Sequence, residues 1–80
     1  MRWIKKSLQE IRVGDILRVD PNPNKEVDDG VLGRDEYRNK VAVIFKVESN
    51  FRYWFRVQNS TSYWHGDNPK RYVFLDRSTQ

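Results

Sequence analysis

The strongest structural constraint in this chain is a regular alternation of side chains over residues 41–48. At a period of two, one set of side chains is entirely apolar, and the other set becomes polar towards its end. β-branched and aromatic residues at this spacing favour a β-strand with one fully buried face. We expect the buried face to carry Val41, Val43, Phe45 and Val47, and the opposite face to carry Ala42, Ile44, Lys46 and Glu48.

Other segments also have the character of strands. Residues 52–58 alternate as well, with Tyr53, Phe55 and Val57 on one side and Arg52, Trp54, Arg56 and Gln58 on the other. Residues 15–19 and 71–75 are shorter runs of the same kind, and residues 3–4 are a candidate for a short terminal strand. Residues 7–10 have the form of a capping box, which predicts one or two helical turns before Gly14.

The connections between these segments differ greatly in length. Residues 48–51 suggest a hairpin turn, with Asn50 as the candidate for a left-handed backbone conformation. Residues 59–70 are rich in turn-forming residues and carry two large aromatic side chains. Residues 20–36 form a long polar loop with six acidic side chains, and a loop of this length in a small domain is typically functional or mobile. We interpret the six carboxylates as a solvated loop.

The order of the elements predicts one mostly β domain over residues 1–80. Four or five short strands with a long first loop and shorter later connections favour a small antiparallel barrel or sandwich. With 80 residues, the chain buries a small core and leaves no room for a second domain.

Charge is unevenly distributed along the chain, whose formal net charge is +4. Residues 1–19 carry five basic against two acidic side chains, residues 20–36 carry two against six, and residues 37–80 carry eight against three. A basic body with one acidic loop is suited to a nucleic acid or an acidic protein surface. The alternative is that Lys and Arg keep a small aromatic-rich domain in solution.

Several functional classes find little support in the sequence. The chain has no Cys, which excludes disulfides, thiolate zinc sites and a cysteine nucleophile, and His65 is its single His. The four Gly residues are scattered, so no glycine-rich phosphate loop is present. His65 lies near Asp67 and Ser60, but a triad is defined by geometry, which one short polar segment does not supply. We therefore expect no enzyme activity, no cofactor, no metal site and no small-molecule substrate.

No apolar run is long enough for a signal peptide or a membrane span. We expect a soluble cytoplasmic protein that does not contact a membrane.

Two groups of side chains are candidates for a binding surface. The first is Arg52, Trp54 and Arg56, in which an aromatic ring lies between two guanidinium groups and suits stacked bases and phosphates, or a protein hot spot. Alternatively, Trp54 packs beneath a loop, with the Arg stems lying over it. The second group is Tyr63, Trp64 and His65, with Lys70 and Arg71 nearby for phosphate contacts, unless an aromatic ring closes one end of the core.

A family resemblance appears in residues 11–19. The phrase Val13-Gly14-Asp15, followed by alternating apolar residues, resembles the opening strand of SH3-like small barrels, including the KOW and Tudor-like groups. The resemblance implies that residues 20–40 form the long first loop and that the later strands form a meander with a closing strand. An OB-like barrel is the alternative fold.

Together these features predict a binding module that is not an enzyme. The leading hypothesis is that it binds RNA or single-stranded DNA through Arg52, Trp54, Arg56, Tyr63, Trp64, Lys70 and Arg71. The alternative is a protein-interaction module, since small cysteine-free domains of this type resemble bacteriophage inhibitors or adaptors that dock on a host protein. A third hypothesis is pairing between copies along an exposed strand edge.

Overall fold

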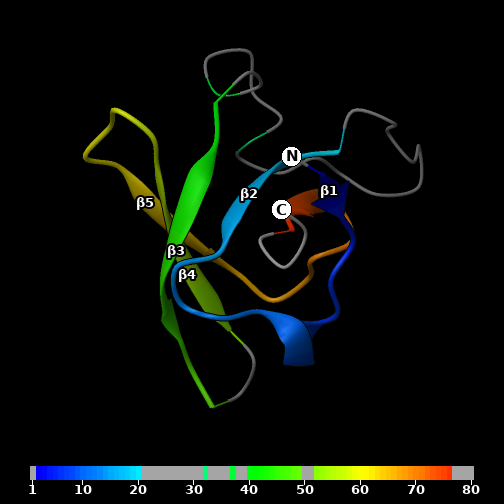
Figure 1. The fold of residues 1–80 in the computed structure, drawn as a ribbon. Helices are drawn as coiled ribbons and strands as arrows, with labels where there is room; N and C mark the ends of the chain where they lie inside the picture. The colour runs from blue at the N-terminus through cyan, green and yellow to red at the C-terminus, as the bar shows by residue number, and fades with distance from the viewer. Residues whose placement is uncertain (1, 21–31, 33–36, 38–39, 50–51, 77–80) are drawn as a thin grey trace.

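The computed structural model describes residues 2–20, 32, 37, 40–49 and 52–76 (Figure 1). These residues form one short 3-10 helix, η1 (Leu8–Glu10), and six strands: β1 (Trp3–Ile4), β2 (Ile16–Val19), β3 (Ala42–Val47), β4 (Tyr53–Val57), β5 (Tyr63–Gly66) and β6 (Tyr72–Leu75). All strand pairs are antiparallel, in the order β1-β6-β2-β3-β4-β5. The prediction of a mostly β fold is confirmed. The sheet is open and has six strands, so a closed barrel of four to five strands is not seen.

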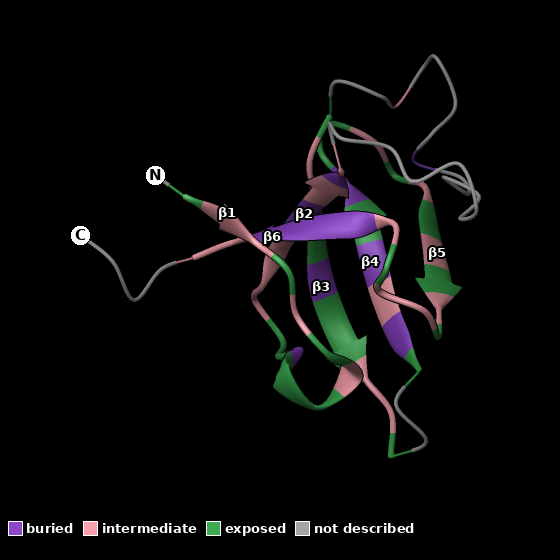
Figure 2. Cartoon of the chain, turned by 90° about the vertical axis from the view of Figure 1, so that its right-hand side faces the viewer, coloured by how far each residue is buried: buried purple, intermediate pink, exposed green. Residues whose placement is uncertain are grey.

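Strands β2 to β5 follow one another as neighbours, and β6 returns to pair with β2. Leu17 is the meeting point, because it lies opposite Ala42 of β3 on one side and Phe74 of β6 on the other. Figure 2 shows β6 passing across β3 and β4, so the sheet folds over on itself. The two halves bury their apolar sides against each other, and a contact between the rings of Phe55 and Tyr72 joins them.

The core lies between these two halves. Its largest fully buried side chains are Tyr53, Phe55, Phe74, Ile11, Leu17, Leu32, Ile44 and Val57. Tyr53, Phe55 and Val57 alternate along β4, as the sequence pattern predicts. The described residues contribute no charged or polar side chain to this core. Leu32 belongs to the acidic segment 20–36, of which the structure otherwise describes only Asp20, so that segment sends one apolar side chain into the core.

The predicted orientation of β3 is wrong. Ala42 and Ile44 are buried, whereas Val43 and Phe45 are 41% and 40% exposed. Directly opposed residues of an antiparallel pair lie on the same face, and Ile44 is opposite the buried Phe55. The register shifts between Ile44 and Lys46, and Phe45 lies at this irregularity. Both sides of the segment are apolar at its start, so its own pattern does not distinguish them.

Strand β5 was predicted as part of a turn-rich connection. It forms because residues 58–61 turn the chain back, with Asn59 at a φ of 61° and the Ser60 amide donating to the Val57 carbonyl. Asn59 thus has the left-handed conformation that the sequence suggested for Asn50, which lies outside the described residues. Tyr63 to Gly66 then pair with β4, from Arg56 to Tyr53.

The N-terminal segment follows the sequence prediction. Trp3 and Ile4 pair with Leu75 and Phe74 of β6. Glu10 Oε1 accepts hydrogen bonds from the Ser7 amide at 3.0 Å and the Ser7 hydroxyl at 2.9 Å, which begins η1 as a capping interaction.

Gly66 should be sensitive to substitution. A Cβ atom there would lie 2.9 Å from the Tyr53 hydroxyl oxygen, and the buried Tyr53 ring has little room to move. We expect Gly66→Ala to lower the free energy of unfolding by about 1–3 kcal/mol, the usual cost of overpacking. Urea denaturation would measure this, with Val13→Ala as the control, because Val13 is 63% exposed. Equal stability of the two variants would contradict the packing described for Gly66.

Candidate binding face

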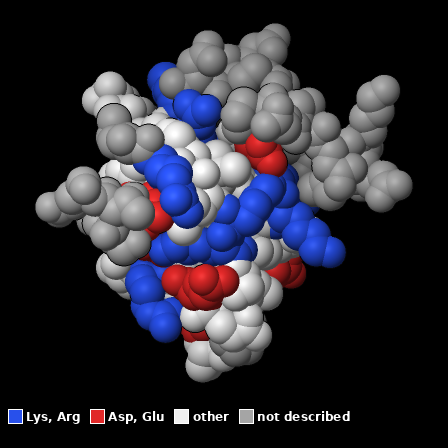
Figure 3. Space-filling view, turned by 45° about the vertical axis from the view of Figure 1, so that its right-hand side comes forward, with Lys and Arg blue, Asp and Glu red and all other residues white. Residues whose placement is uncertain are grey.

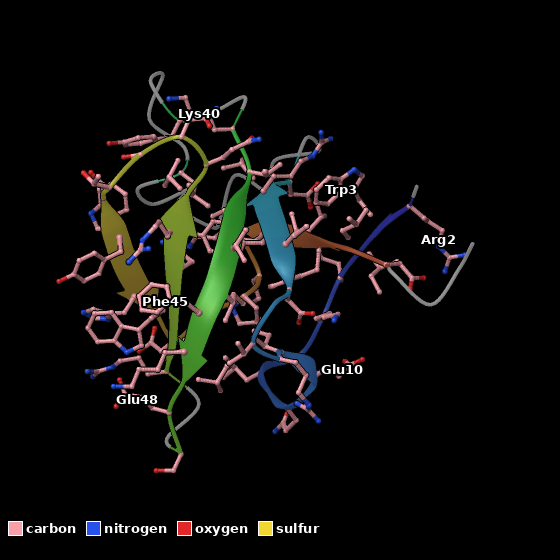
Figure 4. All side chains as sticks on the ribbon, turned by 60° about the vertical axis from the view of Figure 1, so that its left-hand side comes forward. Arg2, Trp3, Glu10, Lys40, Phe45 and Glu48 are labelled. Atoms are coloured by element: carbon pink, nitrogen blue, oxygen red, sulfur yellow. The ribbon has the colours of Figure 1, made fainter. Side chains whose placement is uncertain are left out.

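The outer surface of β3, β4 and β5 carries a group of aromatic side chains. We call this surface the ring face and define it by the aromatic residues Phe45, Trp54, Tyr63 and His65 and the basic residues Lys46, Arg52 and Arg56. It forms because the inner sides of the same strands are occupied by core residues, so that alternate positions point outward. Figure 4 shows Phe45 and Glu48 on this side of the molecule and Arg2, Trp3 and Glu10 on the other side.

The four rings form a continuous chain of contacts. The Phe45 and Tyr63 centroids are 6.0 Å apart, Tyr63 and Trp54 are 6.2 Å apart, and Trp54 and His65 are 4.6 Å apart. These separations lie in the range of favourable aromatic pairs. Tyr63 is nevertheless 55% exposed and Phe45 40% exposed, so the rings present a broad apolar surface to solvent.

Basic side chains lie over the same rings. The Arg56 guanidinium carbon is 5.3 Å from the centroid of Phe45, and Lys46 Nζ is 6.0 Å from that of Trp54. Cation–π attraction at these distances keeps the basic groups close to the ring surface. Both residues are exposed, so the charges remain available to a negatively charged ligand.

Glu48 fixes the position of the Trp54 ring. The Trp54 Nε1–H group donates a hydrogen bond to Glu48 Oε1. This bond is the main cause that lowers the pKa of the Glu48 carboxyl, with smaller contributions from the charges of Lys46, Arg52 and His65. The ring is therefore held at one edge by a carboxylate that stays ionised well into the acid range.

A hollow of about 420 Å³ continues the ring face at the turn between β4 and β5. It is lined by Val43, Arg56 and residues 57–61. Val43 and the stem of Arg56 give its wall apolar character, and the turn adds hydroxyl and amide groups. The hollow can therefore enclose a bulky side chain or similar group, whereas the flat rings can only stack against planar groups.

The structure separates the two candidate groups of the sequence analysis. Trp54 and Arg56 point outward on β4, and Tyr63 joins them from β5. Arg52 is exposed and comes directly before β4. Trp64 points the opposite way from Tyr63, packs against the core and contacts the Tyr37 ring at a centroid distance of 5.2 Å. Lys70 and Arg71 lie in the turn before β6, and Arg71 lines a pocket together with Trp64.

The sequence analysis missed Phe45, Lys46 and His65 as members of this surface. Phe45 was assigned to the core, Lys46 was not considered for binding, and His65 was grouped with Tyr63 and Trp64 rather than with Trp54. The pairing of Lys46 and His65 with Trp54 on its two sides brings them together. The alternation of residues 41–48 places Lys46 on the side of Ile44, which is buried, and the register irregularity between these two residues turns Lys46 outward. No local signal marks His65 as a neighbour of Trp54.

Basic residues elsewhere are closely accompanied by carboxylates. Lys5 Nζ lies 2.7 Å from Asp20 and Lys6 Nζ lies 3.0 Å from Asp15. Figure 3 shows Lys and Arg side chains on another side of the molecule with Asp and Glu among them. Arg18 lies over the Trp3 ring at 4.8 Å. The two ion pairs partly neutralise the basic charge that the sequence places in residues 1–19, and the contact with Trp3 positions the Arg18 guanidinium.

The described residues contain no group of three metal-ligating side chains. Among the same residues, no helix has the length and apolar character needed to cross a membrane. Comparison with known proteins finds no protein-family model, no curated protein and no solved structure that matches the chain significantly.

The hydrogen bond between Trp54 and Glu48 predicts a defined response to acid. Because the folded state lowers the pKa of Glu48, this interaction is present above the ordinary glutamate pKa and is lost as pH falls through the lowered value. We expect the NMR signal of the Trp54 indole N–H to titrate with a midpoint below about pH 4.3, the ordinary value for glutamate. Glu48→Gln should remove this titration. A midpoint at or above the ordinary value would contradict the interaction.

Proposed function

We propose that this protein is a non-enzymatic binding module that holds single-stranded nucleic acid, RNA or DNA, on its ring face. The observation that supports this most directly is the chain of four neighbouring rings, with Lys46 and Arg56 over them and Arg52 close to Glu48. A surface of this composition offers stacking partners to bases and positive charge to phosphates at the same time.

Stacking supplies the apolar part of the proposed interaction. Phe45 and Tyr63 expose much of their rings to water, and a base that covers them removes apolar area from solvent. Base–aromatic stacking contributes roughly 1–3 kcal/mol per base and tolerates any sequence, because every base has a flat face. Two or three stacked bases would therefore give useful affinity without sequence preference.

The three basic side chains supply the electrostatic part. For single strands, the logarithm of affinity falls with the logarithm of salt concentration with a slope of about −0.7 per neutralised phosphate. Three phosphate contacts predict a slope of about −2. Lys46 and Arg56 approach the rings closely, so each phosphate would be held next to the base that it accompanies.

The shape of the surface favours single strands over duplex DNA. Bases of a duplex are stacked on one another and cannot lie against the rings. The helix among the described residues, η1, has three residues and is too short to read a major groove.

A protein partner is the second candidate function. It is favoured by the hollow beside Val43 and Arg56, which could hold an apolar side chain of a partner. Trp, Tyr and Arg are the residues that most often dominate protein interfaces, and the ring face has all three. A small inhibitor or adaptor of the bacteriophage type that docks on an acidic host protein would fit this description.

We also propose that the open sheet is a variant of the SH3-like arrangement rather than an OB-like barrel. Four consecutive antiparallel neighbours, β2 to β5, with a last strand that returns beside β2, support this proposal. The long connection between β2 and β3 occupies the position of the first loop in that arrangement.

Binding to labelled single-stranded RNA, single-stranded DNA and duplex DNA by fluorescence anisotropy tests the proposed function. We expect micromolar or tighter binding to single strands at low salt, and weaker binding to the duplex. Tyr63→Ala and Phe45→Ala should each weaken binding about 5- to 150-fold, which corresponds to the stacking energy of one base. Arg56→Gln should reduce the salt slope by about 0.7.

Arg2→Gln is the matched control, because Arg2 is 68% exposed and lies away from the ring face. It should bind nearly as tightly as the unmodified protein. Absence of binding to every nucleic acid at low salt, or an equal effect of Arg2→Gln and Arg56→Gln, would refute the proposed function. Capture of a protein partner that depends on Tyr63 would then support the second candidate.

A further inference from the structure

A second concave feature lies between the end of β5 and the beginning of β6, two strands that do not pair. It is a pocket of about 240 Å³. Its lining consists of aromatic side chains from three strands and polar residues from the connection between β5 and β6: Tyr53, Phe55, Trp64, His65, Gly66, Asp67, Asn68, Arg71 and Tyr72. The pocket is thus on the other side of β5 from the ring face.

Buried groups hold the pocket in a fixed shape. The Tyr53 hydroxyl donates to the Asn68 carbonyl at 2.9 Å, and burial raises the pKa of this hydroxyl, so it stays protonated as a donor. The Lys70 amide donates to Asn68 Oδ1 at 3.0 Å, which fixes the turn that forms the rim. Gly66 allows the chain to lie against Tyr53, because any Cβ atom there would collide with that ring.

The rim carries a donor without a partner. Arg71 Nε is shielded from solvent and, among the described residues, makes no hydrogen bond. Because that atom is closed to solvent, a ligand would meet the other N–H groups of the Arg71 guanidinium, a side chain that lines the pocket. Asp67 is exposed on the same rim and supplies acceptor oxygens. The pocket therefore combines aromatic walls with a donor and a carboxylate at its edge.

These groups match the chemistry of one nucleic-acid base. Pockets for whole drug-sized ligands range from about 300 to 1,000 Å³, so the smaller volume here suits a single planar group. Guanine is the base that presents two neighbouring N–H donors, N1 and N2, to the two oxygens of a carboxylate, next to the acceptor O6. The half-buried Trp64 offers a wall for stacking.

The pocket and the ring face share β5. β5 is the last strand of the sheet, so a bound strand can pass over its edge. Along β5, Tyr63 lies on the ring face, and Trp64 and Gly66 border the pocket. His65, which contacts Trp54 on the ring face, also lines the pocket. A nucleic acid that follows β5 would thus meet stacking rings on one side and the pocket on the other.

We propose that the pocket accepts one unstacked base from the strand bound on the ring face and that Asp67 and Arg71 make guanine the preferred base. This inference rests on the proposed function and adds to it a preference that stacking alone does not provide. The ring face would bind single strands of any sequence, and the pocket would favour strands that can place a guanine in it.

Anisotropy with an oligothymidylate of about twelve nucleotides, and with versions in which one guanine is placed at successive positions, tests this preference. We expect a guanine at the favoured position to increase affinity about tenfold, the discrimination of one good base contact. Inosine, which lacks the N2 amino group, should lose most of this gain. Asp67→Asn should abolish the difference between guanine and thymine without weakening the binding of plain oligothymidylate.

Equal affinity for all these oligonucleotides, together with dependence on Tyr63, would overturn the inference and leave the proposed function standing. An NMR titration with 5′-GMP tests the pocket separately from the proposed binding of single strands on the ring face. Shifts of the Trp64, Gly66 and Asn68 amides with GMP, and weaker shifts with AMP, would support the pocket even if no oligonucleotide bound the ring face. Equal shifts with both nucleotides, or shifts confined to the ring face, would overturn it. Asp15→Asn provides a matched control for Asp67→Asn and should leave guanine preference unchanged.

Discussion

The structure depends above all on the burial of one side of β4. Tyr53, Phe55 and Val57 are fully buried there, and the pleat of a strand then forces Trp54 and Arg56 to the opposite side. Because β4 pairs with β3 and β5, its orientation is transmitted to both neighbours. Ile44 follows Phe55 into the core, while His65 and Tyr63 follow Trp54 and Arg56 outward. One set of apolar contacts thus organises both the core and the surface that we propose to be functional.

Two surfaces with different chemistry result from this arrangement. The ring face is broad and open, and its basic groups lie against aromatic rings. The pocket beyond β5 is smaller, and its walls are buried rings held by the bond between Tyr53 and Asn68. A flat surface favours stacking, which does not distinguish bases, whereas an enclosed polar rim can do so. In contrast, Lys5 and Lys6 near the N-terminus are engaged with Asp20 and Asp15, and they leave less charge for a ligand.

Much of the fold could be predicted from local patterns. The strands at residues 16–19, 53–57 and 72–75 and the capping of η1 follow from alternation and from the Ser7–Glu10 pair. β5 was not predicted, because the residues after Tyr63 and Trp64 include Gly66 and a turn sequence, and this strand depends on its pairing with β4. The orientation of β3 was predicted wrongly, since Ala42 and Val43 are both apolar and an irregularity occurs at Phe45.

The sequence by itself determined that residues 52–58 have an apolar side and a side with Arg52, Trp54 and Arg56. Only the apolar side of this strand can face a buried core, so the orientation of the strand follows from its own side chains. Tertiary structure alone decided which rings from other strands join Trp54. A strand has a side-chain period of two, so a shift of one residue in register would move every side chain to the opposite face. The registers that place Phe45, Tyr63 and His65 beside Trp54, and Trp64 in the pocket, arise from pairing between segments that are distant in sequence.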